Sequence, residues 1–194
     1  SISDPDLGYT YSDAYIVNSR DGWVVIFGNG YDSYNSEAVL YIIRINSDGS
    51  FANPLNPVTK IFTNAGDNLG GNCNGLSTSA LIDVNLDGLV DFAFAGDLLG
   101  NMWKFDLRDS DVNNWQPAYN SEGDKSGTWE PIFQAKNASG FRQPITTRPE
   151  VMRHCVRGQD GYIVLFGTGR FIGIEDFADS AAVQTIYGIW DWGD

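Results

Sequence analysis

The sequence predicts an all-β protein that forms part of a β-propeller, and three observations support this prediction. The chain is rich in aromatic residues and glycine, with 6 Trp, 9 Tyr, 11 Phe and 22 Gly among 194 residues, which is typical of strands joined by tight turns. Short apolar runs bounded by Gly, Pro, Asn or Asp recur along it. Finally, DGWVVIFGNG at residues 21–30 and DGYIVLFGTG at residues 160–169 form an internal repeat.

The repeat suggests how the strands are grouped. The apolar run at 92–96 aligns with both decapeptides on its glycine, so Gly28, Gly96 and Gly167 are equivalent and lie 68 and 71 residues apart. The unit is then about four strands in roughly 70 residues, and β-propellers repeat four-stranded sheets, about four to eight of them, around an axis. We therefore expect one domain with about three full or partial blades of a larger ring. The expected blades are residues 1–66, 67–136 and 137–194, and a β-sandwich with one duplication is the alternative.

The expected strands follow in order. An outer strand is expected within residues 1–18, and the run at 23–28 is short, β-branched and bounded by turn residues, which favours a buried strand over a helix. The run at 58–63 follows two prolines, so we expect it at a sheet edge. The region 108–128 is polar and rich in turn residues. The other expected strands are 38–46, 78–82, 90–96, 101–107, 129–135 (another edge), 148–154, 162–167 and 185–192.

Charge and composition argue against some classes of function. Acidic residues outnumber basic ones 25 to 12, which gives a net charge of −13 and repels phosphate backbones, so nucleic acid is not an expected partner. This charge suits a secreted protein and cation binding. No apolar run approaches the roughly 18 residues of a membrane-spanning helix. The chain starts at Ser1 without a signal peptide, so we expect a fragment of a longer, processed protein. Cys73 and Cys155 allow either one disulfide or two separate thiols.

Residues 83–91 (DVNLDGLVD) carry the strongest functional pattern. Side chains with oxygen atoms occupy alternate positions, and Gly88 permits the tight turn that points successive oxygens at one centre. A hard cation such as Ca²⁺ takes about six to eight oxygen ligands, whereas Mg²⁺ demands stricter octahedral geometry. We therefore expect a calcium site, with water completing the shell. The expected protein ligands are Asp83, Asn85, Asp87, the backbone carbonyl of Leu89, and Asp91.

Other chemistries lack the residues that they need. An EF-hand requires a bidentate Glu at the twelfth loop position, which is Phe94 here, and the flanks read as strands. His154 is the only histidine, so neither a Ser-His-Asp relay nor a His-rich zinc site is expected, and we interpret it as an ordinary strand residue. Trp103, Trp190 and Trp192 could stack on sugars, but their positions favour packing in the core or between blades. We do not expect an enzyme.

Several segments together resemble one protein family. They are 74–78 (NGLST), the loop 83–91, 95–107 (AGDLLGNMWKFDL), 166–170 (FGTGR) and 187–191 (YGIWD). These segments resemble the type IV pilus tip-associated adhesins and biogenesis factors of the PilY and PilC kind, and the resemblance covers most of residues 20–192. The strand pair at 95–107 alone is also similar to blades of quinoprotein-like propellers.

The resemblance implies a modified β-propeller with Ca²⁺ bound at the surface by Asp83, Asn85, Asp87, the Leu89 carbonyl and Asp91. It also implies that calcium occupancy governs whether pili stay extended or are retracted. The expected location is the pilus tip or outer cell surface, and the expected partners are minor pilins and a host-cell or surface receptor. No Arg-Gly-Asp tripeptide is present for integrin contact. The alternatives are a fragment of a quinoprotein-like dehydrogenase and a purely structural extracellular propeller stapled by calcium.

Overall fold

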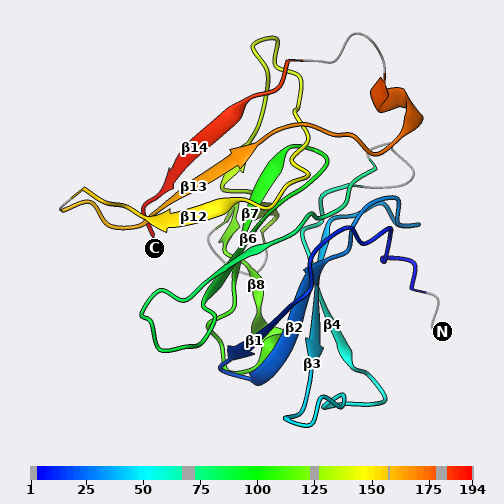
Figure 1. The fold of residues 1–194 in the computed structure, drawn as a ribbon, viewed down its shortest axis with the longest axis vertical. Helices are drawn as coiled ribbons and strands as arrows, with labels where there is room; N and C mark the ends of the chain where they lie inside the picture. The colour runs from blue at the N-terminus through cyan, green and yellow to red at the C-terminus, as the bar shows by residue number, and fades with distance from the viewer. Residues whose placement is uncertain (1–3, 67–72, 123–126, 157, 178–182, 194) are drawn as a thin grey trace.

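A computed structural model describes residues 4–66, 73–122, 127–156, 158–177 and 183–193. Regular structure in these residues is β-strand, apart from two short 3₁₀ helices, η1 (Val112–Asn114) and η2 (Ile174–Phe177). Three larger antiparallel sheets follow one another across the molecule in chain order, coloured blue to cyan, green, and yellow to red (Figure 1). The all-β prediction is therefore confirmed. Within the described residues no helix has the length and apolar character to cross a membrane.

The first sheet contains four antiparallel strands in sequence order. Its last strand, β4, lies at the edge, as the two preceding prolines predict. A tight turn at Arg20 and Asp21 joins the first two strands, and Gly22 follows it with φ 98°. The strands are β1 (Tyr15–Ser19), β2 (Gly22–Gly28), β3 (Val39–Arg44) and β4 (Val58–Phe62).

The second sheet has the order β11-β7-β6-β5, and β8 also pairs with β7. The single edge strand expected at 129–135 is wrong, because Pro131 divides it into β10 and β11, which pair with different strands. Proline cannot donate a ladder hydrogen bond, so pairing stops there. The strands of this sheet are β5 (Ala80–Ile82), β6 (Phe92–Gly96), β7 (Asn101–Asp106), β8 (Gln116–Pro117) and β11 (Phe133–Gln134). The strands β9 (Tyr119–Asn120) and β10 (Trp129–Glu130) form a separate two-stranded sheet.

The third sheet has the order β12-β13-β14, with β12 (Glu150–Arg153), β13 (Tyr162–Gly167) and β14 (Ile186–Asp191). His154, expected within a strand, lies just beyond the end of β12. Its Nδ1 accepts a hydrogen bond from the backbone N–H of Val156 at 3.2 Å. The expected boundaries between blades, after residues 66 and 136, stay predictions.

The middle sheet is buried on both faces because its strands alternate between two hydrophobic clusters. Ala93 and Ala95 of β6 pack towards the first sheet, together with Trp103 of β7. Phe92 and Phe94 pack in the opposite direction, towards the third sheet. Successive side chains of a strand point to opposite faces, so this short run of alternating large and small residues holds three sheets together.

The tryptophans and cysteines divide by exposure. Trp103 is buried, which agrees with the predicted packing in the core. Trp190 and Trp192 are 41% and 72% exposed. Neither of these two packs in the core, because Trp190 lies on the opposite face of β14 from Tyr187 and Ile189, which pack against the second cluster, and packing between blades stays a prediction for both. Cys73 and Cys155 are both exposed and free, so the structure has separate thiols rather than a disulfide.

The three repeated glycines end β2, β6 and β13, which are inner strands of the three sheets. A Cβ atom on Gly28 would overlap the carbonyl oxygens of Leu76 and Ser77, and one on Gly96 would overlap the side chain of Ile145. At Gly167 a Cβ atom would meet nothing within 4 Å. The first two glycines are therefore required because the chain that leads into the next sheet crosses the strand end at close range.

Candidate metal-binding loop

Residues 83–91 connect two neighbouring strands at one end of the middle sheet. Ile82 and Phe92 are paired residues of β5 and β6, and the backbone N–H of Asp91 donates to the carbonyl of Ile82 at 2.8 Å. The loop is therefore closed at its base. The backbone N–H of Val90 donates to the carbonyl of Asn18 in β1 at 2.9 Å, which ties the loop to the first sheet as well.

The first carboxylate of the loop organises its turn. Oδ1 of Asp83 accepts hydrogen bonds from the backbone N–H groups of Leu86 at 2.7 Å and Asp87 at 3.2 Å, and Oδ2 accepts from Gly88 at 2.7 Å. Leu86 and Gly88 have φ values of 61° and 84°, in the left-handed region. Glycine enters this region without steric cost, whereas leucine does not. The three hydrogen bonds to Asp83 stabilise the turn in that conformation.

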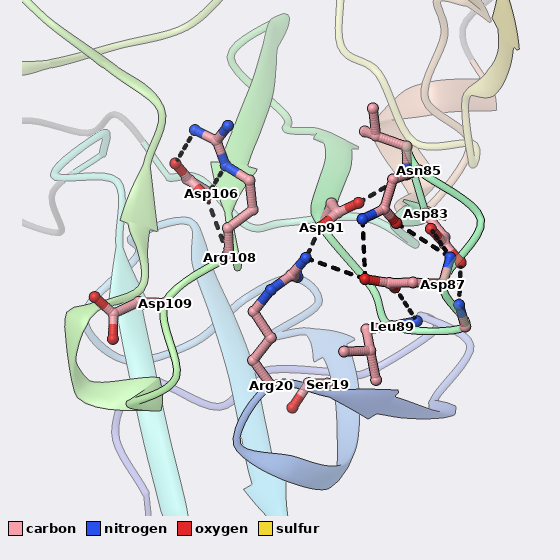
Figure 2. Close-up of polar contacts among 12 residues, drawn as sticks. Ser19, Arg20, Asp83, Asn85, Asp87, Leu89, Asp91, Asp106, Arg108 and Asp109 are labelled. Carbon is pink, nitrogen blue, oxygen red and sulfur yellow. Dashed lines mark hydrogen bonds and ion pairs between the residues drawn. The ribbon is translucent and has the colours of Figure 1, made fainter.

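Asn85 and Asp87 also direct side-chain oxygens to the loop backbone. Oδ1 of Asn85 accepts from the N–H of Asp87 at 3.1 Å, and Oδ1 of Asp87 accepts from the N–H of Leu89 at 2.9 Å. The Asn85 side chain donates to Oδ2 of Asp87 at 2.9 Å (Figure 2). The hydrogen bonds from Asn85 and from the Leu89 backbone lower the pKa of Asp87, and the charge of Arg20 adds to this effect.

Asp91 is the buried member of the set, with a side chain only 3% exposed. Its Oδ2 accepts a hydrogen bond from the backbone N–H of Val84 at 2.8 Å. Its Oδ1 accepts from Nη1 of Arg20 at 2.7 Å, and Nη2 of the same guanidinium lies 3.5 Å from Oδ2 of Asp87. Figure 2 shows the guanidinium pointing towards both carboxylates. Arg20 comes from the turn between β1 and β2, so the first sheet supplies this positive charge.

The charge of the loop is also felt by the third sheet. Burial raises the pKa of Tyr162 in β13, and although Arg153 acts in the opposite direction, the charges of Asp91 and Asp83 raise it further. The loop therefore belongs to the second sheet and is paired with Arg20 of the first, and its charge adds to the raised pKa of one tyrosine in the third.

The donor set fits calcium by its chemistry, since it offers three carboxylates, one amide oxygen and one backbone carbonyl within nine residues. As arranged here, no three acidic, histidine or cysteine side chains in the described part of the chain form a group that could hold a metal ion. Asp83 faces backbone amides, whereas Asp87 and Asp91 face Arg20. The Arg20 guanidinium is thus the positive group that pairs with two of the five predicted ligands, Asp87 and Asp91.

Sequence reasoning missed Arg20. It lies 71 positions before Asp91, and its only local signal is the Asp21-Gly22 turn, which says nothing about where the arginine side chain points. A pairing of this kind depends on how two sheets are stacked, so it has no signature in a single sequence.

A second buried carboxylate, Asp97, follows β6 directly and is fully buried. Its Oδ2 accepts hydrogen bonds from the side chains of Asn74 and Asn101, both at 2.9 Å, and from Nε1 of Trp103 at 2.8 Å. Its Oδ1 accepts from the backbone N–H of Asn101 at 2.8 Å. Burial raises the pKa of Asp97 although these four hydrogen bonds lower it. Three residues of the AGDLLGNMW motif, Asp97, Asn101 and Trp103, are therefore linked by buried hydrogen bonds that stabilise the fold.

Comparisons with known proteins agree with this geometry. The family model described as the PilY1 beta-propeller domain matches residues 3–194. A type IV pilus biogenesis factor PilY1 homolog of Xylella fastidiosa is 41% identical over all of this chain and 13% of its own length. Type IV pilus biogenesis factor PilY1 of Pseudomonas aeruginosa is 39% identical over 97% of this chain and 16% of its own length. The chain therefore spans less than a fifth of either relative.

A solved structure gives the same result. The crystal structure of the Pseudomonas aeruginosa PilY1 C-terminal domain superposes with a TM-score of 0.78 at 35% sequence identity, and the match covers 97% of this chain and 38% of that one. The resemblance to the PilY and PilC kind and the predicted β-propeller class are both confirmed. The chain belongs to the PilY1 β-propeller domain family.

Proposed function

We propose that this chain is a calcium-binding β-propeller module of a type IV pilus tip adhesin, in which calcium at residues 83–91 regulates pilus extension, pilus retraction and adhesion to surfaces. Two relatives are described as type IV pilus biogenesis factors, which supports a role in pili. The observation that carries the calcium proposal is the loop itself, in which side-chain oxygens at alternating positions point into the loop and accept hydrogen bonds from its backbone N–H groups. The proposed location is the pilus tip or outer cell surface, with minor pilins and a surface receptor as partners.

The loop residues would divide the work of holding calcium. Asp83 and Asp91 are anchored by backbone amides, so the protein has already oriented both carboxylates before a metal arrives. Asp87 and Asn85 are exposed and adjust most easily. The Leu89 carbonyl is the fifth protein ligand. Bound calcium would supply two positive charges, which offsets the mutual repulsion of three carboxylates.

The position of the loop indicates how occupancy would affect the rest of the module. The loop is bonded to β1 through Val90 and to the first sheet through Arg20, and its charge reaches Tyr162 of the third sheet. A change of charge here therefore acts at the junction of the first two sheets. Such a junction is a suitable place for a signal that alters how a surface propeller contacts its partners.

Calorimetry with the purified chain tests calcium binding. We expect the chain, freed of metal with a chelator, to bind about one equivalent of Ca²⁺, since the loop offers one shell of oxygens. The double variant Asp87→Ala/Asp91→Ala should bind at least tenfold more weakly, because two carboxylates are lost. Asp48→Ala, which removes an exposed carboxylate from the Asn46–Ser50 turn, is the matched control and should bind like the wild type. Absence of binding, or equal binding by the double variant, contradicts the proposal.

A second experiment separates regulation from a purely structural role. The same double substitution is introduced into the full-length protein in a piliated bacterium, and the amount of surface pili and twitching motility are measured alongside the amount of the protein exported. The regulatory proposal expects altered piliation with normal export and folding. Normal piliation in a strain whose protein no longer binds calcium would leave calcium only a structural role.

A further inference from the structure

We propose that Arg20 is a built-in counter-ion of the loop 83–91 that competes with calcium, so that it sets the calcium affinity and reports loop occupancy to the first sheet. The inference rests on the proposed calcium binding, and it adds a residue outside the loop that determines the strength of that binding. It is carried by the position of a single guanidinium between two of the predicted ligands.

The geometry places Arg20 where a bound cation would be needed. Nη1 lies 2.7 Å from Oδ1 of Asp91 and Nη2 lies 3.5 Å from Oδ2 of Asp87. Arg108, which Figure 2 also draws, does not take this position, because it pairs with Asp106 at 2.7 Å and 2.9 Å. Arg20 is thus the arginine that compensates the charge of the loop.

Asp91 is the point at which the two cations compete. Its Oδ2 accepts the neutral backbone N–H of Val84, whereas its Oδ1 is held by the positively charged Arg20 through a short charge-assisted hydrogen bond, so a cation that approaches Oδ1 meets a positive charge already in place. A guanidinium brings five N–H donors and no acceptor, so it cannot share a crowded shell of oxygens with calcium. Calcium binding through Asp91 therefore requires Arg20 to move away.

Arg20 is able to leave, whereas Asp91 is not. The Arg20 side chain is 27% exposed and originates in a surface turn, so water can solvate its head group after release. The Asp91 side chain is 3% exposed, and the residue directly precedes the buried strand β6. When the binding-competent form of a protein is only fractionally populated, its apparent affinity falls by that fraction. The ion pair with Arg20 populates the form that does not bind, which weakens calcium binding.

Release of Arg20 would pass the signal to the first sheet. The turn that carries it is held by Ser19, whose hydroxyl donates to the carbonyl of Gly22 at 2.7 Å and accepts from the N–H of Asp21 at 3.2 Å. An uncompensated guanidinium would then be presented at the surface where the first two sheets meet. Calcium binding to the loop of the second sheet would therefore change the surface charge of the first sheet.

The test compares Arg20→Gln with the wild type and with Arg44→Gln. Arg44 pairs with Asp21 at 3.5 Å in the same sheet and does not pair with the loop, so it is the matched control. Calorimetry should show that Arg20→Gln binds Ca²⁺ on the order of tenfold more tightly, since a charge-assisted hydrogen bond no longer competes. In a chelator the same variant should melt at a lower temperature than the wild type, and calcium should raise its melting temperature by more. Arg44→Gln should leave the calcium Kd unchanged.

The possible outcomes separate this inference from the proposed function. If the wild type binds calcium and the loop variant Asp87→Ala/Asp91→Ala does not, an unchanged or weaker calcium Kd in Arg20→Gln overturns the role of Arg20 alone. If neither wild type nor Arg20→Gln binds calcium, both proposals fail. A measurement on the unmodified chain guards against misfolding of the variant. The guanidinium resonances of Arg20 should be protected from solvent exchange in a chelator and lose that protection in calcium, and retained protection contradicts the inference.

Discussion

Two acidic centres lie at opposite ends of β6, and they compensate their negative charge in different ways. Asp97, after the last residue of the strand, is surrounded by neutral donors from Asn74, Asn101 and Trp103. Asp91, before the first residue, receives one backbone N–H and the full positive charge of Arg20. The same residue type, on the same strand, therefore occupies a closed centre at one end and an open one at the other.

The two centres differ in whether the groups that compensate the carboxylate are fixed in the core. The donors to Asp97 are themselves buried and cannot leave without breaking the core. The charge that faces Asp91 sits on a side chain that is partly exposed, and in our proposal calcium replaces it. A carboxylate that accepts from fixed neutral donors stabilises the fold, whereas we expect one paired with a partly exposed charge to be able to exchange its partner.

The largest expected effect is the loss of the closed centre. Asp97→Ala leaves three buried side-chain donors without their acceptor, and we expect the free energy of unfolding to fall by about 3–5 kcal/mol. Urea denaturation followed by tryptophan fluorescence measures this change. Asp48→Ala, in an exposed turn, should stay within about 0.5 kcal/mol of the wild type. A loss below about 1 kcal/mol at Asp97 would contradict the structural role.

Calcium should stabilise the open centre and leave the closed one unaffected. At a calcium concentration of about 100 times Kd, the free energy of unfolding should rise by about 2.7 kcal/mol, because only the folded loop binds the ion. Thermal melts with calcium and with a chelator measure the change. Asp87→Ala should lose most of the increase, whereas Asp97→Asn, if enough of it folds, should retain it. Equal responses of these two variants would remove the distinction between the centres.

Gly96 tests how rigidly the closed end of β6 is held. In Gly96→Ala the new Cβ would overlap Ile145, so we expect a loss of about 1–3 kcal/mol from overpacking. Gly167→Ala is the matched change at the equivalent position of the third sheet, where nothing lies within 4 Å. It should change the free energy of unfolding by less than about 1 kcal/mol. Chemical denaturation of both variants under identical conditions gives the comparison, which fails if the two losses are equal.

The smallest effect concerns a third acidic group, where Lys60 lies 2.6 Å from Asp4 and 2.8 Å from Asp6. Burial acts to raise the pKa of Asp4, but the hydrogen bond from Lys60 and the other contacts lower it overall. Burial likewise opposes the charged form of Lys60, but its two carboxylate partners raise its pKa overall. We expect Lys60→Gln to cost about 0.5–1 kcal/mol at pH 7, because the pair is only partly buried.

The sign of each shift defines the pH range of this effect. The lowered pKa of Asp4 contributes stability above the ordinary aspartate value of about 3.9, and this contribution is lost as pH falls below it. The raised pKa of Lys60 contributes below about 10.4 and is lost at higher pH. Thermal melts of wild type and Lys60→Gln should therefore differ by a constant amount from about pH 5 to pH 9 and converge in acid. A difference that persists unchanged at pH 2 would exclude the ion pair as its cause.

The sequence by itself determined those features that depend on neighbouring residues. The alternation of Phe and Ala in 92–95 predicts a strand with two different faces, because side chains of a strand alternate with a period of two. The five oxygen donors of the loop lie within nine residues, so the pattern was readable without a structure, and its calcium ligation stays a prediction. The three repeated glycines also predicted where along the chain an inner strand of each sheet ends, because each glycine belongs to a local sequence pattern.

Only the tertiary structure decided which distant groups meet. It placed Arg20 beside Asp91, brought Asn74 to Asp97, and left Trp190 exposed on the outer face of β14. It also divided the strand expected at 129–135, since each half found a different partner on either side of Pro131. Periodicity and spacing determine which side chains lie on each face of a strand. The residues that contact those side chains come from other sheets, and the packing of the whole chain decides how the sheets are stacked.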